Sequence, residues 1–363
     1  MIIKLNKKSS TDKNLIWEAS VKDNNITYRY GQEDGKIQIK VDVIKAGKNT
    51  GKKNATTPAE QAVLVAETKA LKKLDDGYKL VSGKLPKHET HQMVDVDCPK
   101  PMLAQTYNDH KNKVSDGDVI YAQAKLDGFR IIANTKTGKL YSRKRKLITS
   151  YPHIEEEVRK INIPGVTWID GELYNPDVSF EDIISTRRTK TTNDNMELMQ
   201  FHIFDVVSNK PFSERHEIVN SIKENDIIKR TMTDTIKKNQ IDSIHSLYVS
   251  MGYEGVMLRV TNKGYEEKRS YSLYKYKNFF DKEFEITGFK SLKNDETKLG
   301  SIEFKTEESE TFYANPKFSH VRRAEIFANK EEYLGKMATV KYQEMTEKNV
   351  PRFGRVIEIR DYE

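Results

Sequence analysis

The stretch YAQAKLDGFRIIA, residues 121–133, sets one lysine, Lys125, inside an apolar run. Desolvation lowers the pKa of a buried amine, and an amine that has lost its proton is a nucleophile. Strand alternation places Lys125 and Asp127 on one face, and Gly128 allows a close approach to the backbone. An ordinary surface turn is the alternative, because Asp-Gly pairs are frequent in turns. The stretch alone does not distinguish a nucleophilic lysine from a surface turn, so the rest of the sequence is needed.

The composition limits the class of protein. The chain has 363 residues, enough for two or three domains, and a single cysteine, Cys98. One cysteine excludes an intramolecular disulfide and a multi-cysteine zinc site, and it favours a reducing location. No apolar run approaches the roughly 20 residues that span a bilayer, and the first residues, MIIKLNKKSS, lack the features of a signal peptide. We therefore expect a cytoplasmic protein with no membrane partner.

Positive charge is concentrated near the N-terminus. Residues 1–85 carry 17 Lys and Arg against 10 Asp and Glu, an excess of +7, whereas the whole chain has a net charge of +8. A basic segment of this kind attracts the phosphates of nucleic acid, and such binding weakens as salt rises. A solvated surface without a partner is the alternative.

Hydrophobic patterns divide the chain into three blocks. Residues 1–85 combine strand-like alternation with one helical segment that begins at Pro58. Gly, Pro and polar residues predict a linker at about 82–95. Residues 96–279 mix strands and helices, and residues 280–363 hold five short strands and one helical segment. The last pattern is typical of a closed oligonucleotide-binding (OB) barrel, so the predicted fold class is α+β with several domains.

The hexapeptide KLDGFR, residues 125–130, matches the motif K-x-D-G-x-R that polynucleotide ligases and RNA capping enzymes share. The further motifs of that superfamily follow in order as YSRKRKL, IDGELY, FHIFDVV, YEGVMLR and SLYKYKNF, which begin at residues 141, 169, 201, 253 and 272. The run VKYQEMTEKNVPRFGRVIEIRD, residues 340–361, is similar to the end of small ATP-dependent DNA ligases of viruses and bacteria. On these motifs the chain resembles the ATP-dependent DNA ligases.

The resemblance implies an activity and a set of site residues. The chain would seal nicks between a 5′-phosphate and a 3′-hydroxyl in duplex DNA, with ATP as AMP donor, through an adenylate on the catalytic Lys125 and then an adenylated 5′ end. Mg²⁺, or Mn²⁺ in its place, would bind Glu172 and Glu254, because hard cations prefer oxygen ligands. The residues expected to bind the nucleotide are Gln123, Ala124, Asp127, Arg130, Arg143, Glu172, Phe204, Lys275, Lys277 and Arg360.

Within that set the resemblance implies particular roles. Phe204 would stack on adenine, and the arginines and lysines would hold phosphate and ribose oxygens. Gln123 takes the position from which relatives often contact the edge of adenine, where many of them carry an acidic or hydroxyl side chain. Arg360 would face the pyrophosphate of ATP before the barrel turns, about a hinge near residues 279–282, to clamp DNA.

The resemblance also implies the domain organisation and the partners. Residues 96–279 would form an adenylation (nucleotidyltransferase) domain of antiparallel sheets with helices, and residues 280–363 an OB-fold domain. Residues 1–85 resemble the WGR module of some nucleic-acid-binding proteins, with Tyr30-Gly31-Gln32 in place of Trp-Gly-Arg. We expect a monomer that binds nicked double-stranded DNA and ATP, in the host cytoplasm if the chain is viral. An RNA ligase, a capping-type nucleotidyltransferase and a catalytically silent DNA-end-binding protein stay open as alternatives.

Overall fold

The computed structural model describes residues 1–9, 11–49, 51–85, 94–188, 194–260, 263–292, 295–346 and 348–360. The chain divides into two compact units, of which the first comprises residues 1–100 and 130–162 and the second residues 101–129 and 163–363. Most of the predicted linker, at residues 86–93, lies outside the described residues. Across the described ranges, no helix combines the length and the apolar character that crossing a membrane requires. The domain boundaries predicted from the sequence stay predictions.

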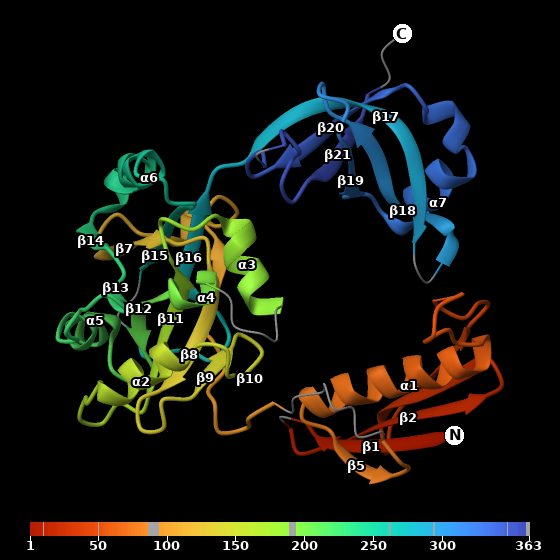
Figure 1. Cartoon of the computed structure of the whole chain (residues 1–363), viewed down its shortest axis with the longest axis horizontal. Coiled ribbons are helices and arrows are strands. Elements are labelled where there is room, and N and C mark those ends of the chain that lie inside the picture. The colour runs from red at the N-terminus through yellow and green to blue at the C-terminus, as the bar shows by residue number, and fades with distance from the viewer. Residues whose placement is uncertain are drawn as a thin grey trace. The chain divides into compact units, whose positions relative to one another are not determined.

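The first unit begins with an antiparallel sheet that carries one helix on its face (Figure 1). The strand order is β4-β3-β2-β1-β5. The helix starts with a capping box, in which the Thr57 hydroxyl accepts from the Glu60 backbone N–H at 3.2 Å and the Glu60 carboxylate accepts from the Thr57 N–H at 2.8 Å. Alternate strand residues pack on the alanines of the helix, which buries one face of the sheet. The elements are β1 (Ile2–Lys8), β2 (Asn14–Lys22), β3 (Asn25–Gln32), β4 (Ile37–Val43), α1 (Pro58–Asp75) and β5 (Lys79–Ser82).

The rest of the first unit is an antiparallel meander followed by a short helix. Strand β9 pairs with both β8 and β10. The Lys146 ammonium, in the turn before β10, lies 2.9 Å from the Asp75 carboxylate at the end of α1, so an ion pair joins the meander to the N-terminal sheet and helix. The elements are β8 (Phe129–Asn134), β9 (Leu140–Ser142), β10 (Leu147–Ile148) and α2 (Pro152–Lys160).

A five-stranded sheet, in the order β14-β7-β15-β16-β6, organises the first part of the second unit. One face is the apolar core, which includes Ala122, Ala124 and Val256. Because side chains alternate along a strand, the opposite face of β7 carries Gln123 and Lys125. The elements are β6 (Leu103–Thr106), β7 (Ile120–Lys125), β14 (Thr233–Ile236), β15 (Gly255–Arg259) and β16 (Arg269–Lys277).

A second group of strands in this unit pairs β11 antiparallel with β12 and β12 parallel with β13. Helix α5 packs against β12, and α6 packs against β15 and β7. The elements are β11 (Trp168–Tyr174), α3 (Phe180–Arg188), α4 (Asp194–Glu197), β12 (Gln200–Val206), α5 (Phe212–Asn220), β13 (Ile228–Arg230), α6 (Ile241–Ser250) and the 3₁₀ turns η1 (Lys111–Lys113) and η2 (Lys238–Gln240).

The C-terminal part of the second unit is a closed five-stranded barrel in the order β17-β18-β19-β21-β20 (Figure 1). The long strand β17 pairs along different parts of its length with β18 and with β20, which closes the barrel. The predicted α+β class and the predicted C-terminal barrel are confirmed. The elements are β17 (Phe280–Leu292), β18 (Asp295–Lys305), β19 (Thr311–Pro316), α7 (His320–Ala328), η3 (Lys330–Tyr333), β20 (Met337–Tyr342) and β21 (Arg355–Ile359).

Candidate active site

Three charged side chains meet where the neighbouring strands β7, β15 and β16 come together. Lys125 ends β7, Lys277 ends β16, and Glu254 directly precedes β15. The pairing register sets Gly255 opposite both Lys125 and Lys277, which brings the two lysines to either side of Glu254. The Lys125 ammonium donates to Oε2 of Glu254, and the Lys277 ammonium donates to Oε1 at 2.8 Å. The sequence predicted all three as site residues, but with Glu254 as a metal ligand rather than as the partner of the two lysines.

These charges are largely removed from water. The side chains of Lys125, Glu254 and Lys277 are 21%, 13% and 12% exposed. Burial alone would raise the pKa of Glu254, but the positive charges of the two lysines outweigh burial and lower it. The carboxylate therefore stays ionised and is the anion that holds both ammonium groups in place.

Lys275 lies two residues before Lys277 on β16, at the place that pairs with Met257. Burial, and after it the charges of Lys277 and Lys125, lower the pKa of Lys275. Within the described part of the chain, no carboxylate forms an ion pair with the Lys275 ammonium. A half-buried cation without an anionic partner suits an incoming phosphate.

Asp127 connects the lysine motif to the barrel. Burial, and after it the charge of Glu254, raise the pKa of Asp127. Nη1 of Arg352, from the segment between β20 and β21, donates to Oδ2 of Asp127 at 2.8 Å. The Arg352 guanidinium also lies 3.5 Å from the ring centre of Phe180. A cavity of about 250 Å³ adjoins this contact, lined by Asp127, Tyr174, Val178, Phe180, Glu181, Ile183, Glu344, Met345, Thr346 and Arg352.

The sequence analysis assigned Arg360 as the arginine of the last motif and did not identify Arg352 as a site residue. Arg360 donates to Glu283 at 2.9 Å and to Glu358 at 2.7 Å, both within the barrel. The sequence offers one signal for Arg352, its place in the run PRFGR. In the structure the next residue, Phe353, has a φ of +57°. The role of Arg360 in facing the pyrophosphate of ATP stays a prediction.

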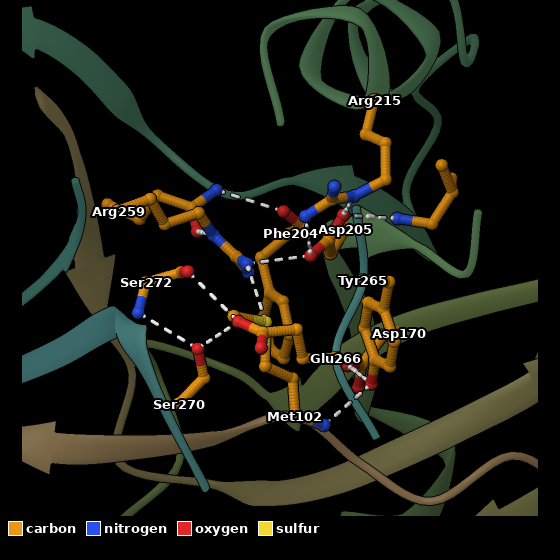
Figure 2. Close-up of polar contacts among 12 residues, drawn as sticks. Met102, Asp170, Phe204, Asp205, Arg215, Arg259, Tyr265, Glu266, Ser270 and Ser272 are labelled. Atoms are coloured by element: carbon orange, nitrogen blue, oxygen red, sulfur yellow. Dashed lines mark hydrogen bonds and ion pairs between the residues drawn. The ribbon is translucent and has the colours of Figure 1, made fainter. Parts of the chain in front are cut away.

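Gln123 is buried, with 2% of its surface exposed. Its Nε2 donates to the Phe204 carbonyl at 3.0 Å and to the Thr233 hydroxyl at 3.3 Å, and its Oε1 accepts from Nε of Arg259 at 2.8 Å. Figure 2 shows the Arg259 and Arg215 side chains converging on Asp205 beside Phe204. A polar network therefore joins β7 to the strand that carries Phe204.

The remaining predicted residues are distributed as follows. Ala124 belongs to the apolar core on the other face of β7, so only its backbone can contact a nucleotide. Phe204 and Glu172 are half-buried on β12 and β11. Arg130, on β8, and the exposed Arg143, after β9, belong to the first unit, and their part in ATP binding stays a prediction.

The structure explains the glycine at position 128 by contacts within the protein, whereas the sequence suggested that it lets a ligand approach the backbone. A Cβ atom on Gly128 would lie 2.0 Å from the carbonyl oxygen of Leu173 and 3.0 Å from Cγ of Glu172. The space that the missing side chain leaves is therefore filled by β11, rather than being kept open for a ligand. This close approach also brings Glu172 next to the lysine motif.

The carboxylates at this place fit a hard divalent cation in their chemistry. Burial, and after it the charge of Glu254, raise the pKa of Asp127, and the oxygens of both carboxylates are ligands that Mg²⁺ accepts. Glu172 lies beside Gly128, close to the same motif. The described residues contain no group of three or more His, Cys, Asp and Glu side chains that could hold a metal ion. A cation here would need oxygens from a substrate as well.

Comparison with known families gives the identity of both parts of the second unit. Residues 101–277 match the family described as the ATP dependent DNA ligase domain, and residues 294–360 match the DNA ligase OB-like domain. The chain belongs to the ATP-dependent DNA ligases. The motif-based prediction of a DNA ligase is thereby confirmed, and the RNA ligase, capping enzyme and silent binding protein are set aside.

Individual relatives are also DNA ligases. It is 27% identical to the DNA ligase of an African swine fever virus isolate, over 91% of this chain and 82% of the relative. It is also 27% identical to a DNA ligase of Methanococcus maripaludis, over 55% of this chain and 42% of the relative. A solved structure from a study of Lig E DNA ligases shares the fold, with a TM-score of 0.60 and 22% identity over 74% of this ligase and all of that chain.

The N-terminal segment is not identified in the same way. Both matched families begin after residue 100 of this ligase. None of these comparisons supports a WGR module, so the predicted resemblance of Tyr30-Gly31-Gln32 to the WGR signature is not confirmed. The order of strands and helix predicted for residues 1–85 does agree with the structure.

Proposed function

We propose that Lys125 is the residue that carries AMP in this ligase. Its ammonium would first lose a proton, and the neutral Nζ would attack the α-phosphorus of ATP. A phosphorus–nitrogen bond would form with loss of a second proton, and the bond to the bridging oxygen would break with release of pyrophosphate. The AMP would then pass to the 5′-phosphate at a nick, and the 3′-hydroxyl would displace AMP to form the phosphodiester. The observation that carries this proposal is the pair of contacts through which Glu254 holds Lys125 beside Lys277.

The nucleotide would bind along the same face of the sheet. Lys275 and Lys277 alternate on β16 and so face the same phosphates, and Lys275 is the cation without a carboxylate partner in the described residues. Phe204 would stack on adenine. Arg130 and Arg143 would contact ribose and phosphate oxygens. Asp127, Glu172 and Glu254 are the carboxylates that would hold Mg²⁺, which when bound would neutralise phosphate charge.

The barrel would take part through Arg352. Its ion pair with Asp127 at 2.8 Å and its contact with Phe180 join the barrel to the lysine motif. We propose that this contact holds the barrel in the arrangement used on DNA. Arg360, bonded to Glu283 within the barrel, would face the pyrophosphate in a different arrangement, with the short connection of Asn278 and Phe279 as the hinge.

The N-terminal sheet and helix would add affinity for the DNA backbone. The segment between β4 and α1 contains four lysines and no acidic residue. Lys48, Lys52 and Lys53 in this segment are exposed. Lysines of this kind neutralise DNA phosphates and release counterions, which makes binding depend steeply on salt. We propose this role without reference to the WGR module.

Nick binding at several salt concentrations tests the N-terminal role in the full-length ligase. Replacing Lys48, Lys52 and Lys53 by Gln should flatten the slope of log K against log salt by roughly 0.9 for each DNA phosphate that the variant no longer neutralises, with self-adenylation unchanged. The matched control is Lys4→Gln with Lys8→Gln, because each of these lysines has a carboxylate partner at 3.5 Å. Equal slopes for the two variants would overturn the proposal.

A further inference from the structure

Strand β4 forms an open edge of the N-terminal sheet. In the part of the chain that the structure describes, β4 pairs with β3 alone. Three of its β-branched side chains, those of Ile39, Val41 and Val43, are 69%, 56% and 55% exposed. An exposed apolar edge strand is a template for pairing with another strand. We therefore expect this edge to bind a partner.

The backbone of β4 offers hydrogen-bonding groups to such a partner at the same three residues. The N–H of Ile44, the residue after β4, donates to the Asn24 carbonyl at 2.8 Å, toward the side of β3. Because backbone groups alternate in direction along a strand, the N–H and C=O groups of Ile39, Val41 and Val43 point away from β3. Within the described ranges, no loop or turn backbone bonds to these groups. They can therefore pair with a further strand.

The two faces of β4 carry different side chains. Lys40 and Asp42 face helix α1, since the Asp42 carboxylate lies 2.7 Å from the ammonium of Lys69 on that helix. The three exposed apolar side chains therefore lie on the opposite face of the sheet. The Lys40 ammonium also lies 3.0 Å from the Asp42 carboxylate of the same strand. The edge thus carries one charge of each sign, two residues apart.

We propose that β4 is the contact surface for a second copy of this ligase, and that the two β4 strands pair antiparallel about Val41. This register sets Lys40 opposite Asp42 of the second copy, so opposite charges meet on the helix side of the sheet. On the other face Ile39 meets Val43 of the second copy, and Val41 meets itself. A pair centred on Lys40 or on Asp42 would instead set like charges against each other. The charges therefore favour a second copy as the partner, in one register.

The backbone directions agree with this register. The three outward-facing backbone positions fall opposite one another and form the hydrogen-bonded pairs, whereas Lys40 and Asp42 fall at the intervening pairs, where side chains lie closer. Lys40 contacts Oδ1 of Asp42 and Lys69 contacts Oδ2, so Lys40 can exchange its own Asp42 for that of the second copy while Lys69 keeps its contact. One pair of strands buries a small area, so the dimer should be reversible, at roughly micromolar to millimolar concentrations. The dilute ligase would stay the monomer expected from the sequence.

Sedimentation equilibrium of the full-length ligase without DNA tests the inference. The wild-type protein should dimerise as its concentration rises. Val41→Lys and Val41→Glu should each weaken the dimer by about tenfold or more, because like charges then meet at the centre of the paired strands. An equimolar mixture of these two variants should regain dimerisation, because position 41 faces position 41 of the second copy in the proposed register and opposite charges then meet there.

Ile2→Lys is the matched control. Ile2 is 51% exposed and lies on the same face as Val41, but on β1, which β2 and β5 flank. This variant should dimerise as the wild type does. A wild-type ligase that stays monomeric at every concentration, a mixture that does not regain dimerisation, or equal weakening by Ile2→Lys would overturn the inference. Association that appears only when DNA is added would assign this edge to DNA and would overturn the inference as well.

Discussion

Replacing Glu254 by Gln removes the one negative charge that lies between Lys125 and Lys277. The change preserves the size of the side chain and its ability to accept hydrogen bonds. The substitution removes the negative charge that balances the ammonium groups of Lys125 and Lys277. The side chains of these three residues are only 12–21% exposed. The variant therefore separates the electrostatic role of Glu254 from its packing.

The expected loss follows from this burial. Leaving a buried charge without its partner costs about 3–5 kcal/mol, and Glu254 has two such partners. We therefore expect the free energy of unfolding to fall by about 3 kcal/mol or more at neutral pH. Because the pKa of Glu254 is lowered in the folded protein, the wild-type contribution is complete above its ordinary value of 4.5 and is lost as pH falls through the folded-state pKa.

Urea unfolding at neutral pH measures this loss, provided that the slope m is unchanged. The control is Glu224→Gln, which removes a carboxylate 2.7 Å from Arg230 in a pair whose side chains are 38% and 36% exposed. Such a surface pair contributes about 0–1 kcal/mol. Equal losses in the two variants would show that the cluster at Glu254 contributes no more than a surface ion pair.

Three further predictions concern single positions. Lys275→Met should raise KM for ATP in self-adenylation, and an unchanged KM would count against phosphate binding by Lys275. The lowered pKa of Lys275 means that its ammonium loses its proton below the ordinary lysine value of 10.5. The KM of the wild-type ligase should therefore rise at an alkaline pH below 10.5. Arg352→Ala should slow nick sealing more than Arg360→Ala, as single-turnover sealing would measure, because Arg352 donates to Asp127 of the lysine motif whereas Arg360 donates to Glu283 of the barrel. Gly128→Ala should destabilise the fold by several kcal/mol in urea unfolding, since a Cβ atom would meet the Leu173 carbonyl at 2.0 Å; a neutral effect would contradict the close approach of β11.

The sequence was sufficient for the parts of the site that lie on short motifs. Lys125, Glu254 and Lys277 sit at ends of strands whose alternation is readable, and the sheet register then brings them together. The five-stranded barrel was likewise readable from regular strand spacing. In both cases the local pattern and the final contacts agree.

Other features depend on contacts that no local pattern encodes. Oε1 of Gln123 accepts from Nε of Arg259, which lies 136 positions away in sequence. The contact of Arg352 with Asp127 spans 225 positions, and two arginines in one short C-terminal run look alike before the fold separates them. The crowding at Gly128 comes from β11, which a turn-like Asp-Gly pair does not reveal.

The most direct measurement is mass spectrometry of the full-length ligase after incubation with ATP and Mg²⁺. We expect one adenylyl group, located on the peptide that contains Lys125, and no such group in Lys125→Ala. An adenylate on a different residue, or none on the folded wild-type protein, would contradict the assignment of Lys125 as the residue that carries AMP.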